Sequence, residues 1–446
     1  MEDTIAAIST ALGVGAISII RVSGDDSIKI VNKIFDRNIM DVPSHTIHYG
    51  HIIDNNEIID EVLVSIMRTP KTFTTENIVE INCHGGISTT NKVLELVLRN
   101  GARMALPGEF TKRAFLNGRI DLIEAESVMN LINSKTESSR KMAINGLNGR
   151  VSSMISNLRS NMIDIISNIE VNIDYPEYED ILVVTKDMLK ISMKKITTEL
   201  SKILREAQNG KLIKDGIKTL IIGRPNVGKS SILNKLLNED KAIVTDIEGT
   251  TRDIVEGDVN IDGILLNIID TAGIRETDDV IEKIGVDKSL NLINDADLVI
   301  VVLNNNEELR KEDEDIIKAT NNKNRIIFVN KSDLNKKLKI KLPVIYGSTL
   351  IDNGLDDLKN EIKKLFNMDD IEKRDLNYLS SANEISIVKE CLDIAKSIEA
   401  NLNTDLEIDM IEIDIKRIWE LLGNLIGESY DEELLDNLFD RFCLGK

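Results

Sequence analysis

The stretch Gly223-Arg224-Pro225-Asn226-Val227-Gly228-Lys229-Ser230 decides how the middle of this chain folds. It follows the apolar run 217–222, which is typical of a buried strand, and it opens the segment 230–237, which is apolar at helical spacing. A glycine-rich turn that joins a strand to a helix and ends in Gly-Lys-Ser is the phosphate-binding P-loop pattern. We therefore expect backbone N–H groups and the helix N-terminus to surround a β-phosphate there. Lys229 would neutralise the β- and γ-phosphates, and the Ser230 hydroxyl would bind Mg²⁺.

The P-loop lies near the start of a region in which strand-like and helical segments alternate. Such alternation predicts a mostly parallel, doubly wound sheet, as in Ras-like nucleotide-binding domains. The expected strands are 217–222, 264–269, 298–303, 325–329 and 344–346. We assign residues 216–370 to this domain.

Two further motifs follow in the order that a GTP-binding domain requires. Asp270-Thr271-Ala272-Gly273 ends the run 264–269, so Asp270 is placed to reach Mg²⁺ through water and Gly273 to donate to a γ-phosphate. Asn330-Lys331-Ser332-Asp333 ends the run 325–329. The Asp333 carboxylate can accept hydrogen bonds from guanine N1 and the 2-amino group, a donor pair that adenine lacks. The second motif therefore favours GTP over ATP.

The segment between these motifs has the features of a switch loop. Thr250-Thr251 precedes Asp270, and Thr251 is placed to complete a Mg²⁺ shell. Ile274 follows Gly273 where small GTPases carry a Gln that orients the attacking water. Because isoleucine cannot form a side-chain hydrogen bond, another group must orient that water. Four nearby acids are candidates, although a solvated charge run explains most of them equally simply: Glu276, Asp278, Asp279 and Glu282.

Composition limits the partners and the compartment of the chain. Its 446 residues predict two to four domains, and its formal net charge of −20 excludes nucleic-acid binding through the overall field, so that a local basic patch or a partner would be required. Cys83, Cys391 and Cys443 are too few and too scattered for a disulfide framework, which indicates a reducing compartment, the cytoplasm. No apolar run approaches the roughly 18 residues that span a bilayer.

The segments that flank the nucleotide domain differ in pattern. Residues 1–118 mix strand-like runs (16–22, 62–67 and 78–82) with a helical segment at 89–100, which predicts an α+β domain. Residues 119–215 and 371–446 are predominantly helical. We therefore expect a discontinuous helical domain with the nucleotide domain inserted into it.

Three segments outside the nucleotide domain point to one family. They are Glu80-Ile81-Asn82-Cys83-His84-Gly85-Gly86, Pro107-Gly108-Glu109-Phe110-Thr111 with the following Arg113-Ala114-Phe115-Leu116-Asn117-Gly118, and the final Phe442-Cys443-Leu444-Gly445-Lys446. Together with the nucleotide motifs they resemble the MnmE/TrmE family of tRNA modification GTPases, in the TRAFAC class. The resemblance implies an N-terminal domain that binds 5-formyl-tetrahydrofolate, or a related formyl- or methylene-tetrahydrofolate, and forms a homodimer. It also implies a heterotetramer with the flavoprotein MnmG, which installs a carboxymethylaminomethyl group on C5 of the wobble uridine of certain tRNAs. G domains of this family dimerise across a K⁺ ion, which replaces an arginine finger.

The resemblance also assigns roles to matching positions. It makes Glu282, Lys229 and Asp270 catalytic, Glu282 as the acid that orients water. Ser230 and Thr251 match the Mg²⁺ ligands. Further sets are the K⁺ ligands Asn226, Thr245, Ile247 and Thr250, and the folate site Arg21, Glu80, Arg119 and Lys446. The GTP site comprises Asn226, Val227, Gly228, Lys229, Ser230, Ser231, Thr245, Asp246, Ile247, Glu248, Gly249, Thr250, Thr251, Asp270, Thr271, Ala272, Gly273, Asn330, Lys331 and Asp333.

Some positions stay open to more than one interpretation. Ser348-Thr349 stands where the family usually has Ser-Ala, so guanine contacts from that loop are less secure. Cys443 is either a nucleophile near the folate site or a small buried residue. His45, His48 and His51 lie on an expected strand, where a three-residue step sends neighbours to opposite faces, so a metal site is the weaker interpretation. A ribosome-assembly GTPase and a scaffold that binds GTP without turnover are the alternatives in function, and Lys229, Asp270 and Glu282 argue against the second.

Overall fold

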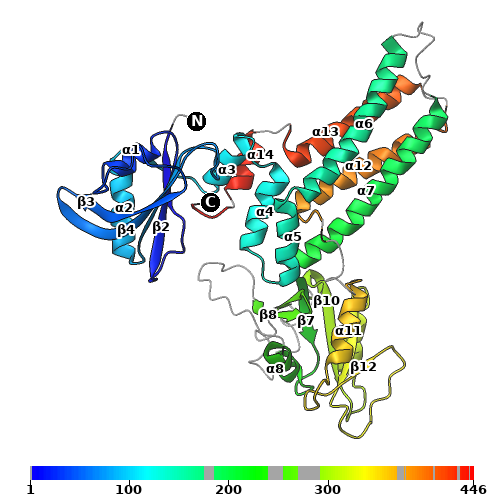
Figure 1. The fold of residues 1–446 in the computed structure, drawn as a ribbon. Helices are drawn as coiled ribbons and strands as arrows, with labels where there is room; N and C mark the ends of the chain where they lie inside the picture. Colours follow the sequence, from blue (N-terminus) through cyan, green and yellow to red (C-terminus); the bar gives the residue numbers. More distant parts are fainter. Residues whose placement is uncertain are drawn as a thin grey trace. The chain divides into compact units, whose positions relative to one another are not determined.

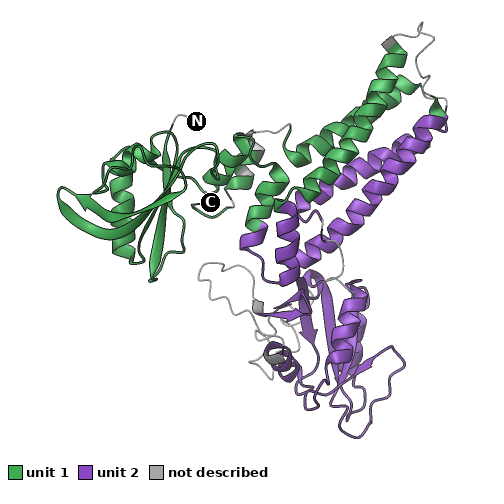
Figure 2. Cartoon of the chain, viewed as in Figure 1, with its two compact units in different colours: residues 1–129, 147–186, 405–446 green, residues 130–146, 187–404 purple. Residues whose placement is uncertain are grey.

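The computed structural model describes residues 3–174, 185–239, 255–269, 292–368, 376, 378–404, 407–428, 432–440 and 442–445. The chain forms two compact units, each built from separate stretches of sequence (Figure 2). Unit 1 comprises residues 1–129, 147–186 and 405–446, and unit 2 comprises residues 130–146 and 187–404.

Unit 1 contains a six-stranded sheet in the order β3-β4-β5-β2-β1-β6 (Figure 1). Neighbouring strands are antiparallel, except that β1 and β6 are parallel. The helices α1 (Ser27–Asn32) and α2 (Ile87–Arg99) share a core of buried aliphatic side chains with one face of the sheet. The strands are β1 (Ile5–Ile8), β2 (Ile17–Ser23), β3 (Thr46–Asp54), β4 (Glu57–Met67), β5 (Ile78–His84) and β6 (Arg103–Met104). The expected α+β domain is confirmed.

The rest of unit 1 is helical. Phe115, Phe439 and Phe442 form an aromatic cluster that joins α3 to α14 and to the last residues of the chain. Along another helix pair, the Arg159 guanidinium of α6 lies over the Trp419 ring of α13, 4.3 Å from its centroid. The helices are α3 (Glu109–Leu116), α4 (Leu122–Ile132), α6 (Arg150–Asp174), α13 (Ile408–Ile426) and α14 (Glu432–Phe439).

Unit 2 contains the second sheet, in the order β12-β11-β10-β7-β9-β8. All its pairings are parallel except that of the edge strand β8 with β9. The seven residues of the central strand β10 are all buried, as expected where helices cover both faces of a sheet. The strands are β7 (Ile217–Ile222), β8 (Val255–Ile261), β9 (Ile264–Ile269), β10 (Leu298–Asn304), β11 (Arg325–Asn330) and β12 (Ile345–Tyr346).

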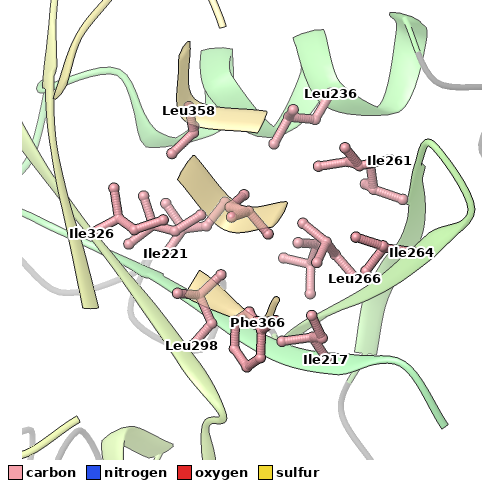
Figure 3. Packing of buried hydrophobic residues seen from close by; sticks show 14 of the residues in the cluster. Ile217, Ile221, Leu236, Ile261, Ile264, Leu266, Leu298, Ile326, Leu358 and Phe366 are labelled. Atoms are coloured by element: carbon pink, nitrogen blue, oxygen red, sulfur yellow. The ribbon is translucent and has the colours of Figure 1, made fainter. Parts of the chain in front are cut away.

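Helices lie on both sides of this sheet, which confirms the doubly wound architecture. On one side, α8 (Lys229–Glu239) and α11 (Asp356–Leu365) bury Leu236 and Leu358 against the strands (Figure 3). On the other side, α10 (Lys311–Ala319) packs against a second aliphatic cluster.

Unit 2 also includes the helices α5 (Glu137–Leu147), α7 (Lys186–Asp215) and α12 (Ala382–Asn401). The helical segments expected around the nucleotide domain are therefore divided between the two units. No helix in the described ranges has the length and apolar content to cross a bilayer.

Candidate functional site

The P-loop follows β7 in a conformation that requires glycine at two positions. A Cβ at Gly223 would lie 2.5 Å from the Val302 carbonyl oxygen, and one at Gly228 would lie 2.2 Å from Asn330 Nδ2. Gly228 has a φ of +101° and Asn226 a φ of +64°, both in the left-handed region. The loop thus curls tightly before α8, which leaves the N–H groups at the helix N-terminus as an anion cradle.

Lys229 closes this loop with its own side chain. Its Nζ donates to the carbonyl oxygens of Gly223 at 2.7 Å and Arg224 at 2.9 Å. Burial lowers the pKa of the Lys229 ammonium group. A desolvated cation held only by neutral carbonyls gains strongly from phosphate oxygens, so this geometry fits an anionic ligand.

The Arg224 side chain is anchored away from the loop interior. Its buried guanidinium donates through Nε to Asp313 Oδ1 at 2.7 Å and through Nη1 and Nη2 to Glu307 Oε2 at 3.2 Å. Asp313 is also buried and accepts from the Arg310 N–H at the start of α10. This role of Arg224 was not predicted, since its partners lie more than 80 residues away in the chain.

The guanine motif is tied directly to the P-loop. Asn330 Nδ2 donates to the Val227 carbonyl at 3.0 Å, and Lys331 Nζ donates to the Asn226 carbonyl at 2.9 Å. The structure therefore brings together the described members of the predicted GTP site at the carboxyl ends of β7 and β11, where ligands bind in such sheets.

The loop after β12 braces Asp333. Ser348 Oγ donates to Asp333 Oδ1 and accepts from the Leu350 N–H at 3.2 Å. Lys235, on α8, donates to the carbonyl oxygens of Thr349 at 3.3 Å and Ile351 at 2.5 Å. Although Thr349 replaces the usual Ala, the Ser348 hydroxyl orients the Asp333 carboxylate.

Several predicted residues lie outside the described part of the chain: Thr245, Asp246, Ile247, Glu248, Gly249, Thr250, Thr251, Asp270, Thr271, Ala272, Gly273, Glu282 and Lys446. Among the predicted metal ligands, the structure describes Ser230 for Mg²⁺ and Asn226 for K⁺, and it exposes both next to the P-loop turn. An oxygen donor on each suits a hard cation.

In unit 1, Arg21 and Glu80 form an ion pair on neighbouring strands. Arg21 Nη2 lies 2.8 Å from Glu80 Oε1, and Arg21 Nη1 donates to the Gly445 carbonyl at 3.2 Å. Ser9 Oγ donates to the same carbonyl at 3.2 Å. A Cβ at Gly445 would lie 2.5 Å from the Ile8 carbonyl, so only glycine lets the chain end approach β1 this closely. The terminal motif is thereby docked beside two predicted folate residues.

Arg119 lies beside the same apolar cluster as Arg21. The Arg21 guanidinium lies over the Phe110 ring at 5.7 Å, and the Arg119 guanidinium lies over the Phe73 ring at 4.9 Å. Phe110 belongs to a small buried cluster with Ile5, and Phe73 packs against it. Two predicted anion-binding cations thus flank one aromatic cluster.

Cys443 is exposed, and its carbonyl accepts from the Gly108 N–H at 3.4 Å. The interpretation of Cys443 as a small buried residue is therefore wrong, because the chain end turns its side chain outward. The nucleophile interpretation stays a prediction. Cys83 and Cys391 are buried.

A buried arginine supports this part of unit 1 and was not predicted. The Arg113 side chain is fully buried and bonds Asp3, Glu76 and Glu109 at 2.7 to 3.1 Å. Burial alone would raise the pKa of Glu109, but Arg103, Arg113 and the Leu106 N–H hold it below its usual value. The network fixes α3, which carries Phe110, to the start of the chain and to the loop that carries Phe73.

The three histidines take separate partners, and His45 lies just before β3 and not on it as expected. His45 and His48 bond neighbouring hydroxyls, and His51 Nδ1 lies 2.7 Å from Asp36 Oδ2. Within the described residues there is no group of three His, Cys, Asp or Glu side chains placed to hold a metal ion.

Comparisons with known proteins cover the whole chain. Residues 4–119 match the family model of the GTP-binding protein TrmE N-terminus, and residues 122–443 match that of the MnmE helical domain. The tRNA modification GTPase MnmE of Bacillus cereus (strain ATCC 10987 / NRS 248) is 51% identical over 456 residues, covering 100% of this chain and 99% of that protein. The protein of the same name from Streptococcus thermophilus (strain CNRZ 1066) is 50% identical over 450 residues, covering 100% of this chain and 98% of that protein.

Among solved structures, the similarity extends over part of the chain. The G domain of the T. maritima FeoB iron transporter is 28% identical and covers 33% of this chain and 98% of its own, with a TM-score of 0.25.

Proposed function

This chain belongs to the MnmE family of tRNA modification GTPases, and on that premise we propose that it is a K⁺-dependent GTPase that modifies the wobble uridine of certain tRNAs. The observation that carries the proposal is the link between its two nucleotide motifs. Asn330 and Lys331 bond the P-loop carbonyls of Val227 and Asn226, so the base-recognition and phosphate-binding groups belong to one rigid site.

GTP binding follows from the described residues. The N–H groups of the P-loop and of α8 surround the β-phosphate, and Lys229 exchanges the carbonyls of Gly223 and Arg224 for phosphate oxygens. Asp333, oriented by Ser348, accepts hydrogen bonds from guanine N1 and the 2-amino group. Ser348 thus keeps this carboxylate in place for guanine.

Hydrolysis requires positive charge beside the γ-phosphate and a water molecule that is oriented for attack. We propose that Ser230 and Thr251 hold Mg²⁺, with Asp270 reaching it through water, and that Glu282 orients the attacking water. A bound Mg²⁺ supplies positive charge against the β- and γ-phosphates. For K⁺ we propose the oxygen ligands Asn226, Thr245, Ile247 and Thr250, which take the place of an arginine finger when two G domains meet. Arg224 cannot serve as that finger, because Asp313 and Glu307 hold its guanidinium.

We propose that the N-terminal site binds a formylated tetrahydrofolate. Glu80 forms an ion pair with Arg21 through Oε1, and we propose that its carboxylate also accepts a hydrogen bond from a pterin N–H. The anionic glutamyl tail suits Arg21, Arg119 or Lys446. The Arg21 and Arg119 guanidinium groups lie over Phe110 and Phe73, so both cations are held beside one aromatic cluster.

The assembly is proposed on family grounds. We propose a cytoplasmic homodimer that forms a heterotetramer with MnmG and acts on tRNA within that complex. We retain the division into residues 1–118, 119–215, 216–370 and 371–446 as the proposed functional segments.

The K⁺ part of the proposal is tested by GTP hydrolysis in matched KCl and NaCl. Wild-type protein should turn over GTP faster in KCl, whereas the Glu282→Ala variant should bind GTP but hydrolyse it slowly in both salts. Loss of one general acid–base group costs about 10²- to 10⁴-fold in rate. Equal rates of the wild-type protein in the two salts would rule out the cation role.

A further inference from the structure

Helix α7 carries a charge opposite to that of the chain as a whole. Between Lys186 and Asp215 it has eight Lys and Arg residues against four Asp and Glu residues. The complete chain has 55 basic and 75 acidic residues. A local basic surface is what a protein with net charge −20 needs in order to approach a polyanion.

The two faces of α7 are clearly different. Its buried side chains recur at steps of three and four residues, from Leu189 to Ile213, as in a helix packed along its full length. Between positions 194 and 211 the exposed side chains are all basic or neutral polar, and none is acidic: Lys194, Lys195, Thr198, Ser201, Lys202, Arg205, Gln208 and Lys211. We call Lys194, Lys195, Lys202, Arg205 and Lys211 the α7 basic face.

These cations are scarcely neutralised by the protein. Lys202 has Glu206 at 4.0 Å, the limit for an ion pair, and Glu199 and Glu206 flank the face as half-buried residues. Within the described residues the other four cations of the face have no ion-pair partner. By contrast, Lys416 of α13 lies 2.6 Å from both Glu170 and Glu412. Lys202 and Arg205 stand three residues apart, where like charges repel one another, so an anion bound at the face would stabilise it.

The dimensions and chemistry of the face fit a phosphate backbone. Residues 194 to 211 of a helix that rises about 1.5 Å per residue extend over about 25 Å. Phosphates along one strand of a duplex recur about every 3.4 Å along its axis, so several phosphates fit beside the face. Its exposed residues include no aromatic side chain for base stacking. Flexible lysines and neutral hydroxyl or amide groups contact phosphates and sugars without reading sequence.

We propose that the α7 basic face binds the phosphate backbone of tRNA. This inference rests on the proposed function, in which the protein acts on tRNA. In sequence, the helix that carries this face directly precedes the nucleotide site. Helix α7 ends at Asp215, and β7, which leads into the P-loop, begins at Ile217. RNA binding and GTP binding would then lie on one continuous segment of unit 2.

The test measures binding of an in vitro transcribed tRNA to the full-length chain at a series of salt concentrations. The variant Lys195→Gln/Lys202→Gln/Arg205→Gln removes three cations that face away from the buried side of α7. Each lost phosphate contact removes about 0.7 to 0.9 from the slope of log K against log salt. We expect the slope to fall by about 2 to 3 and the affinity at low salt to fall at least about tenfold.

A matched variant controls for net charge. Lys318→Gln/Lys341→Gln/Lys364→Gln also removes three exposed cations of unit 2, and it should leave the salt slope unchanged. Both variants should keep the wild-type rate of GTP hydrolysis, which shows that they are folded.

Three results would overturn the inference: no binding of tRNA by the wild-type chain even at low salt, an unchanged slope in the α7 variant, or an equal loss in both variants. If the α7 variant binds tRNA normally but fails to modify it in cells, the face serves an acidic protein partner instead. Failure of the proposed function would give a different result: cells that lack the protein would have normally modified wobble uridines.

Discussion

Gly228 is the position at which a single methyl group should separate the two halves of the nucleotide site. In a Gly228→Ala variant the new Cβ would lie 2.2 Å from Asn330 Nδ2, and the residue would have to keep a φ of +101°. The left-handed region costs an L-residue about 1 to 2 kcal/mol. Displacing the hydrogen bond from Asn330 to the Val227 carbonyl costs about 1 kcal/mol more.

The variant can relieve this strain by moving the loop, but nucleotide binding must restore the original geometry. The strain of about 2 to 3 kcal/mol should therefore appear as weaker binding, which corresponds to a Kd for GTP raised about 30- to 150-fold. The assay is equilibrium titration of a fluorescent GTP analogue in the presence of Mg²⁺.

Gly118 provides the matched control. It has a φ of +70°, and a Cβ there would meet no atom within 4 Å, so Gly118→Ala introduces backbone strain without a clash. GTP affinity should be unchanged in that variant. An unchanged Kd in Gly228→Ala would refute the idea that Asn330 and the P-loop form one rigid site.

Three more perturbations test single contacts. Lys235→Met removes the ammonium group that bonds the carbonyl oxygens of Thr349 and Ile351, so a fluorescent GDP should dissociate about fivefold faster in stopped flow. An unchanged dissociation rate would show that these contacts do not support the guanine site. Arg224→Met leaves the buried Asp313 carboxylate without its cation and should destabilise unit 2 by about 3 kcal/mol, seen as faster hydrogen exchange in β7 and β10, with partial rescue by Arg224→Lys. Glu109 has a lowered pKa in the folded protein, so its contribution to stability is present above the ordinary value of 4.5 and is lost as pH falls through the folded pKa. Glu109→Gln should accordingly be less stable at neutral pH, and its melting temperature should fall less on acidification than that of the wild type.

The sheet of unit 2 was largely predictable because parallel strands buried on both faces are continuous apolar runs. The expected strands at 217–222, 264–269 and 298–303 correspond to β7, β9 and β10. The edge strand β8 was not predicted, since its sequence VEGDVNI is half polar. A signal was present nonetheless: Asp262-Gly263 between β8 and β9 is a two-residue hairpin turn with φ of +47° and +89°.

The ion networks could not be predicted, because they join positions that only the folded chain brings together. Arg224 lies within a motif whose predicted roles belong to its glycines, Asn226, Lys229 and Ser230. Its side chain instead bonds Asp313 of α10 and Glu307. Arg113 lies in the segment that identified the family, but its burial depends on Asp3 and Glu76. In both cases a cation next to a binding motif would be read from sequence as a ligand contact.

The folate prediction depended on resemblance, and the structure adds geometry to it. Charge alone did not distinguish Arg21 and Arg119 from ordinary surface cations. In the fold, each lies over an aromatic ring of one cluster, and the chain end binds beside Arg21. The fold thus brings Arg21 to the chain end, over a distance in sequence that no local pattern spans.

Nucleoside analysis of tRNA tests the central claim most directly. Cells that lack this protein should contain wobble uridines without the carboxymethylaminomethyl group. A wild-type copy should restore the modification, and a Glu282→Ala copy should leave it absent or strongly reduced. Normally modified wobble uridines in the cells that lack the protein would contradict the account.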